Sequence, residues 1–220
     1  MTSSSIHLGL AGATALMGLA VATPAIAGTQ GNTIEINEIR IEQTGADLDH
    51  YVELKGPPGA LLDGLAYVVV GDQSSVFPPQ QNGYVEEFVA LDGFAIGADG
   101  FFVIAESSFS LCTPDLVAPL NFEGSDNVTH LLIENCGLGL GSGLDTDADG
   151  VAEGLAGCTV VDSVALMQSL NPDGISEDLV YSSTLVGPDG GLVPAQVYRC
   201  ADTGAWGIAG ADLGESDTPC

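Results

Sequence analysis

The sequence predicts an all-β sandwich with long loops rich in glycine and aspartate, and three observations support this prediction. Apolar residues recur at every second position in several short runs, which is the spacing of strands with one buried face. Thirty glycines and eleven prolines mark frequent turns between these runs. No long segment of the sequence combines helical periodicity with suitable caps. Short strand-like runs separated by turn signals are typical of a sandwich.

The first two predicted strands, at 33–41 and 51–55, form a pair joined by a polar turn. Ile36 ends one alternating run, and Ile39 belongs to a second run that is out of phase with the first by one position. A slip of one residue turns the buried face toward solvent unless a bulge absorbs it. We therefore predict a bulge or sharp bend at residues 37–38.

Further strands follow along the chain, separated by irregular segments. The runs at 65–70 and 101–105 are apolar on both faces, which predicts a buried strand for the first and a central strand for the second. Glu86 and Glu87 mark the wet or bulged part of their strand, and Pro194 favours an edge position or a strand start for the final or penultimate strand. The predicted strands after the opening pair are 65–70, 84–91, 101–105, 129–134, 160–167, 179–181 and 193–200.

The N-terminal segment has the features of a secretory signal peptide. Residues 1–27 contain no Asp, Glu, Lys or Arg, an apolar run occupies 8–22, and 24–27 offers small residues where a signal peptidase cleaves. We predict cleavage after Ala27, with 28–220 as one secreted domain. The alternative, a retained anchor helix, needs roughly 18–20 consecutive apolar residues, and this run is shorter and interrupted by glycine.

The net charge is the strongest compositional signal. Thirty acidic residues face three basic ones, which gives −27 at pH 7. Such a field repels phosphate backbones and anionic lipids, so we expect neither a nucleic-acid partner nor membrane insertion. Two explanations stay open: the acidic surface suits salty surroundings, where screening weakens self-repulsion, or it holds divalent cations.

The segment 145–153 carries the sharpest chemical signal. Aspartates at alternate positions before a glycine can converge on one Ca²⁺, which takes about six to eight oxygen ligands. The segment fills five positions of an EF-hand loop, but Ala156 stands where the bidentate glutamate belongs and no helices flank it. We therefore predict a looser calcium loop, with a solvated acidic loop as the alternative. The predicted ligands are Asp145, Asp147, Asp149, Val151 and Glu153.

Two further groups of residues have ligand chemistry. Asp47, Asp49 and Glu53 form a second acidic cluster, for which we expect a solvated turn and keep a second cation site as the alternative. His50 and His130 adjoin predicted strands, so surface or cross-strand roles are expected rather than metal binding or acid–base catalysis.

No catalytic pattern is present in the sequence. Gly-x-Ser-x-Gly, His-Glu-x-x-His and a phosphate-binding glycine loop are all missing. Carboxylates are so numerous that pairs arise by chance, so a glycosidase reaction gains no support. We expect a protein that is not an enzyme.

Five cysteines in a secreted chain predict disulfides and one free thiol. Their spacing does not resemble a zinc site. We predict a Cys136–Cys158 bridge around the calcium loop and a Cys200–Cys220 bridge at the tail, with Cys112 free. The pairing Cys112–Cys136 stays open because connectivity does not follow from sequence.

Ile36-Asn-Glu-Ile, an acidic turn and Tyr51-Val-Glu-Leu together resemble the opening of the lamin-tail domain, an Ile-Asn-Glu strand followed by an aromatic-Ile/Val-Glu-Leu strand. The resemblance implies an immunoglobulin-like β-sandwich. It also implies a bacterial secreted or surface protein whose domain is not catalytic but often accompanies extracellular nucleases, phosphatases or proteases. Later segments that keep the family's order are 62–70, 98–105, 161–164 and 198–206.

These observations together predict a secreted, non-catalytic module for surface or matrix interaction or adhesion, stabilised by calcium. Its expected partner is an extracellular protein or polysaccharide. The alternative is an accessory domain of an extracellular nuclease- or phosphatase-type hydrolase, or a divergent hydrolase.

Overall fold

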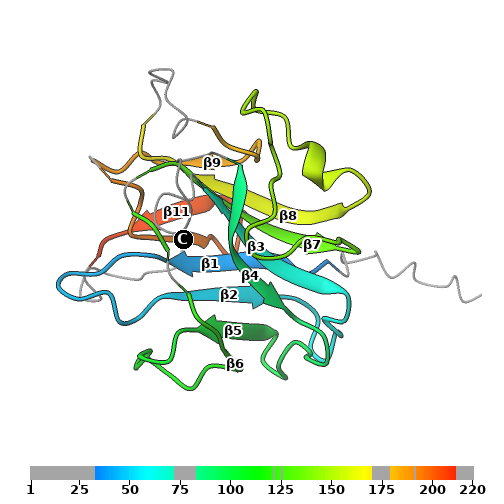
Figure 1. Cartoon of the computed structure of the whole chain (residues 1–220). Helices are drawn as coiled ribbons and strands as arrows, with labels where there is room; N and C mark the ends of the chain where they lie inside the picture. The colour runs from blue at the N-terminus through cyan, green and yellow to red at the C-terminus, as the bar shows by residue number, and fades with distance from the viewer. Residues whose placement is uncertain are drawn as a thin grey trace, which may run out of the picture. The chain divides into compact units, whose positions relative to one another are not determined.

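The computed structural model describes residues 33–71, 83–120, 122–124, 126–169, 179–190 and 192–211. Within these ranges, the strands form two β-sheets (Figure 1), and a shared apolar core lies between them. The all-β prediction is confirmed, since one 3₁₀ turn at Glu153–Leu155 is the sole helical element of the described residues. The predicted signal peptide at 1–27 and its cleavage site lie outside them.

The first sheet has six strands in the order β11-β10-β1-β2-β5-β6. All neighbours are antiparallel except β5 and β6, which are parallel. In Figure 1, β2 lies beside β1 (blue), and β10 pairs with the other edge of β1. The strands are β1 Glu35–Arg40, β2 Tyr51–Lys55, β5 Phe101–Ala105, β6 Leu116–Val117, β10 Gln196–Arg199 and β11 Trp206–Ala209.

The predicted bulge in β1 is confirmed. The register between β1 and β2 shifts between Ile36 and Glu38, which makes Asn37 the extra residue. Each sheet supplies one side chain that holds the backbone at this bulge. The Ile36 N–H donates to Asp162 Oδ2 of the five-stranded sheet at 2.8 Å, and the Ile36 carbonyl accepts from Arg199 Nε of the neighbouring strand β10 at 2.8 Å. Arg199 Nη2 also pairs with Asp162 Oδ2 at 2.8 Å. An ion pair between the sheets therefore fixes the bulge.

The second sheet has five strands in the order β4-β3-β7-β8-β9. β3 is buried along its whole length, as its continuous apolar run predicts. Its pairing with β4 shifts register between Val69 and Val70, which confirms a bulge in the predicted part of β4. Glu86 is the extra residue, whereas Glu87 pairs with Val69. The strands are β3 Leu65–Gly71, β4 Tyr84–Ala90, β7 Val128–Glu134, β8 Thr159–Leu166 and β9 Leu185–Val186.

Some strand predictions were wrong. The segment 179–181 is not a strand: the Tyr181 N–H donates to the Thr129 side chain at 3.0 Å, and the short β9 pairs with β8 instead. Of the two alternatives predicted from Pro194, the edge position is wrong, because β10 lies between β1 and β11. The structure favours the strand start, since β10 begins at Gln196, two residues after the proline. Strand β5 is less central than predicted, since its outer neighbour is the two-residue β6. Strand β11, which carries Trp206, was not predicted.

A second apolar cluster lies on the outer face of the five-stranded sheet. Val68 and Leu131 point away from the inter-sheet core and contact apolar side chains from the segment between Cys136 and Cys158, among them Leu138 and Leu155. We call residues 136–158 the cover segment. It closes one outer face of the sandwich, whereas the outer face of the six-stranded sheet carries polar side chains.

A candidate calcium loop and a pocket on the open sheet

Three predicted calcium ligands converge within the cover segment. One carboxylate oxygen from each of Asp145, Asp147 and Asp149 lies within 4.8 Å of the others. Asp145 is buried, and the other two are exposed. Its Oδ2 accepts hydrogen bonds from the Gly150 N–H at 2.8 Å and the Tyr181 hydroxyl at 3.0 Å, and its Oδ1 accepts from the Asp149 N–H at 3.2 Å. Asp145 thus anchors the loop.

The charge state of Asp145 follows from these hydrogen bonds. Burial alone would raise its pKa, but the Gly150 N–H, the Tyr181 hydroxyl and backbone N–H groups of the loop together lower the pKa below its usual value. The carboxylate is therefore ionised at neutral pH. Burial raises the pKa of the Tyr181 hydroxyl, and the hydrogen bond to Asp145 raises it further.

Backbone conformation brings the loop back on itself. Ala148 has φ 56° and Gly150 has φ 87°, both in the left-handed region, where glycine carries little strain and alanine more. Asp149 Oδ1 accepts from the Val151 N–H at 2.9 Å, which closes a local turn. The left-handed conformations of Ala148 and Gly150 turn the chain sharply enough for the alternate aspartates to approach one another.

The other two predicted ligands have different positions. The Val151 carbonyl accepts the Glu153 N–H at 3.2 Å, and Glu153 begins the 3₁₀ turn. The Glu153 carboxylate is not part of the group of converging oxygens found among the described residues. Glu153 occupies the ninth position of the EF-hand pattern, but the chain enters the 3₁₀ turn there and does not follow the path of an EF-hand loop.

The predicted disulfide around this loop is confirmed. Cys136 and Cys158 are bonded, with Cα atoms 4.8 Å apart and a sequence separation of 22. Cys112 is free and exposed, as predicted. Cys200 is disulfide-bonded, while Cys220, its predicted partner, lies outside the described residues. Both ends of the cover segment are therefore fixed beside the sheet that it covers.

The second acidic cluster does not converge. Asp49 Oδ1 accepts from the Ser110 N–H at 2.7 Å, and Glu53 Oε1 accepts from Asn37 Nδ2 at 2.7 Å. Asp47 instead accepts from the backbone of its own turn at 3.1 Å. In the described ranges, the Asp145 group is the one set of three or more such side chains close enough to share a metal ion.

The two histidines are buried, so the surface role expected for them was wrong. His130 on β7 stacks on Tyr67 of β3, with its Nδ1 2.6 Å from the tyrosine hydroxyl, which confirms a cross-strand role. His50 Nδ1 lies 3.4 Å from the Leu120 carbonyl. Both rings pack on Phe122, at 5.4 Å and 5.5 Å between centroids. Burial lowers the pKa of His130 to about 3.

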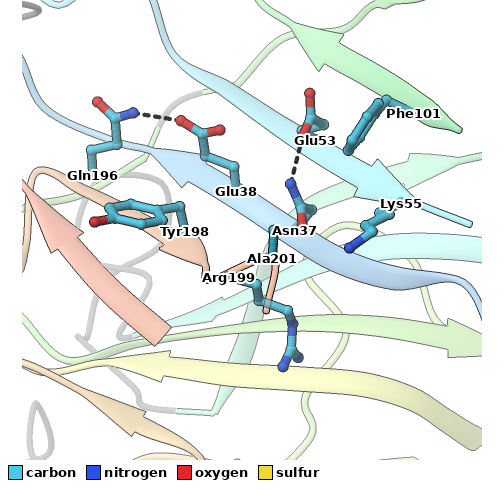
Figure 2. A pocket seen from close by; sticks show the side chains of 9 residues that line it. All are labelled: Asn37, Glu38, Glu53, Lys55, Phe101, Gln196, Tyr198, Arg199 and Ala201. Carbon is cyan, nitrogen blue, oxygen red and sulfur yellow. Dashed lines mark hydrogen bonds between the residues drawn. The ribbon is translucent and has the colours of Figure 1, made fainter. Parts of the chain in front are cut away.

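Sequence reasoning missed a pocket on the outer face of the six-stranded sheet, drawn in Figure 2. Its volume is about 310 Å³. Tyr198 of β10 pairs with Glu38 of β1, which pairs with Glu53 of β2, so the three side chains form one row across three strands. Phe101 of β5 lines the far side. Each position is an outward one in an alternating strand, but the sequence does not tell which distant strands are neighbours.

A buried hydrogen-bond network holds one wall of this pocket. Glu38 Oε1 accepts from the Tyr51 hydroxyl and from Gln196 Nε2, the latter at 2.5 Å. Gln196 Oε1 in turn accepts from Arg40 Nη1 at 2.6 Å, and both of these residues are buried. Burial, followed by the charge of Glu38, raises the pKa of Tyr51 well above its usual value. Glu38 is therefore held in place by its neighbours.

The pocket has two carboxylates at its centre and two cations at its edge. Burial raises the pKa of Glu53; the hydrogen bond from Asn37 opposes this shift, and the charge of Glu38 adds to it. The cations at the pocket's edge already have acidic partners. Lys55 Nζ lies 3.8 Å from Glu35, and Arg199 forms the ion pair with Asp162 described above.

The fold and these two sites describe a β-sandwich with one covered outer face and one open outer face. Comparisons with protein-family models, with curated proteins and with solved structures found no match. Over the described residues, no helix has the length and apolar character needed to cross a bilayer.

Proposed function

We propose that the chain is a secreted, non-catalytic β-sandwich module that binds an extracellular surface or matrix component. The observation that carries this proposal is the pocket on the open sheet, formed by aromatic, amide and acidic side chains from four strands. A rigid sheet that presents a concave, mixed polar and aromatic surface suits recognition of a macromolecule. The partner is an extracellular protein or polysaccharide, and nucleic acid is disfavoured by the charge of −27.

The positions of the histidines support a non-catalytic role. His130 is fully buried and His50 nearly so, and a general acid or base has to reach its substrate. One observation favours a second candidate, a divergent hydrolase or an accessory domain of one: Glu38 and Glu53 face each other in the pocket, and carboxylate pairs cleave glycosidic bonds.

A binding assay combined with a hydrolase panel separates these candidates. The exported protein is incubated with immobilised extracellular polysaccharides and matrix proteins, and with chromogenic glycosides, phosphate esters and nucleic acid, with and without calcium. Retention on a ligand without turnover supports the binding module. Turnover that Glu53→Gln abolishes would replace it with the hydrolase.

We also propose that the chain is a lamin-tail-like domain with an immunoglobulin-like sandwich. The two motifs that open the resemblance pair as β1 and β2. The closing motif is joined to them, because the Arg199 guanidinium lies 4.5 Å from the ring centroid of Trp206 and bonds the Ile36 carbonyl. Contacts among these distant motifs support the proposal, since a chance resemblance would not require them to meet.

Secretion is part of the proposal, and the N-terminus tests it. The apolar run and the small residues before Gly28 motivate cleavage after Ala27. N-terminal sequencing of the exported protein should give Gly28 as the first residue. Soluble protein that still begins at Met1 would contradict the proposed secretion.

We further propose that Ca²⁺ stabilises the cover segment through the Asp145 group. Three carboxylates within 4.8 Å repel one another, and a bound cation that binds the folded state alone raises its stability. Millimolar calcium should raise the melting temperature of the wild type relative to chelator. Asp147→Asn should abolish this rise, whereas Asp202→Asn, the same charge change at an exposed turn, should preserve it. Equal shifts in both variants would contradict a site at Asp147.

A further inference from the structure

The pocket on the six-stranded sheet has flat aromatic sides and a polar centre. Tyr198 and Phe101 stand on strands that are three positions apart, about 14 Å at the usual strand spacing. Glu38 and Glu53 lie between them (Figure 2). Both aromatic residues are partly exposed, so their side chains remain accessible to a ligand.

The polar centre offers hydrogen-bond acceptors in a row. Glu38 and Glu53 each use Oε1 to accept from protein side chains. The Oε2 atom of each has no hydrogen-bond partner among the described residues. An ionised carboxylate accepts only, so a ligand at this row has to bring donors. Because the network from Arg40 and Gln196 fixes Glu38, little ordering is required on binding.

Charge excludes anionic ligands from this pocket. Two carboxylates lie at its centre, and both cations at its edge are paired with acidic residues outside the centre. The chain as a whole carries −27. The third basic residue, Arg40, is buried, and its guanidinium donates to Gln196 and to the Ala211 carbonyl. A phosphate, sulfate or uronate group at the centre of the pocket would therefore meet repulsion from the two carboxylates.

From this arrangement we infer that the pocket binds a short stretch of neutral polysaccharide, with sugar hydroxyls donating to Glu38 and Glu53 and sugar C–H faces packing on Tyr198 and Phe101. This inference rests on the proposed binding function and names its ligand class and site. A row of acceptors between two separated aromatic rings matches a ligand with donors and apolar faces along its length. A single ammonium group or metal ion is too small to contact both rings at once, because they stand three strands apart.

Affinity electrophoresis of the exported protein tests this inference. The gels contain a neutral β-glucan, a neutral α-glucan or an anionic polyuronate, with plain gels for reference. A neutral polysaccharide should retard the wild type, and the polyuronate should not. Tyr198→Ala and Glu53→Gln should each weaken the retardation at least about tenfold. Tyr84→Ala, which removes a partly exposed tyrosine from the other sheet, is the matched control and should bind as the wild type does.

The other outcomes separate this inference from the proposed function. Retardation that the Tyr198 and Glu53 variants leave unchanged would overturn the assignment to this pocket while the binding function stands. Binding of spermine or calcium at the pocket, measured by calorimetry and lost in Glu38→Gln, without retardation by any neutral glucan, would overturn the ligand class. Absence of any extracellular ligand together with enzymatic turnover would overturn the proposed function itself. Unchanged far-UV circular dichroism confirms that each variant is folded.

Discussion

The two outer faces of this sandwich differ in what lies over them. On the five-stranded sheet, β3 and β7 are buried on both sides, and the cover segment closes the outer side with Leu138 and Leu155. On the six-stranded sheet, β1 and β2 alternate, and their outward residues form a polar pocket. A strand with apolar residues on both sides, such as β3, requires a cover, whereas an alternating strand leaves a face available for recognition.

The cover segment stabilises the fold in spite of its composition. It is rich in glycine and aspartate and has little regular structure of its own. The disulfide fixes the two ends of the segment, and the buried Asp145 fixes its middle. A few leucines of the segment can therefore pack on the sheet. Covalent and hydrogen-bond constraints here take the place of a helix or a further strand.

The largest expected effect comes from the core beneath the cover. Leu131 is fully buried there, so Leu131→Ala should lower the free energy of unfolding by about 3 kcal/mol. Tyr198→Ala on the open face should cost under about 1 kcal/mol, because surface substitutions remove little buried area. Urea denaturation of both variants measures the difference. Similar costs would mean that the two faces are equally buried in solution.

The disulfide gives the next largest effect. Replacing Cys136 and Cys158 together by serine should cost roughly 3 kcal/mol on the chain-entropy model for a separation of 22 residues. Hydrogen exchange should also quicken on β3 and β7 rather than on β1 and β2. Cys112→Ser is the control and should change neither quantity. An unchanged midpoint of denaturation in the double variant would show that the cover does not depend on its bridge.

The titration of His130 comes third and tests the core that lies between both faces. Burial lowers its pKa to about 3, whereas an unfolded histidine titrates near 6.5, so the unfolded state binds the proton more readily. Its contribution to stability is therefore full above pH 6.5 and declines as the pH falls toward 3. Between pH 7.5 and 5.5, the expected loss is about 1.4 kcal/mol.

Denaturation at several pH values, on the wild type and on His130→Gln, measures this loss. The variant should show a flatter profile over the same range, even if its stability is lower throughout. If stability changes equally with pH in the wild type and in the variant, the His130 imidazole is in contact with water in the folded protein.

Much of the fold and of the Asp145 loop follows from local sequence. The phase slip around Asn37 predicts the bulge, and the aspartates of the loop, like Cys136 and Cys158, are close enough along the chain to be grouped without knowledge of the topology. The pocket could not be predicted, because Tyr198 and Glu38 come together only once β10 pairs with β1. The histidines were misplaced for the same reason: their partners belong to distant segments.

The smallest expected effect concerns charge on the open face. Glu38 and Glu53 are direct cross-strand partners, and like charges in this position destabilise a sheet by a few tenths of a kcal/mol to about 1 kcal/mol. Glu53→Gln keeps an acceptor for Asn37 and removes the repulsion, so its melting temperature in low salt should exceed that of the wild type by a few degrees at most. Sodium chloride near 1 M should raise the melting temperature of both proteins, because it screens the net charge of −27, and should narrow the gap between them. Asp202→Asn, at an exposed turn of the same sheet, should follow the wild type closely in both salts. An equal difference in melting temperature between the two proteins in low and high salt would mean that Glu53 affects stability through packing. Side-chain packing rather than charge repulsion would then determine the stability of the open face.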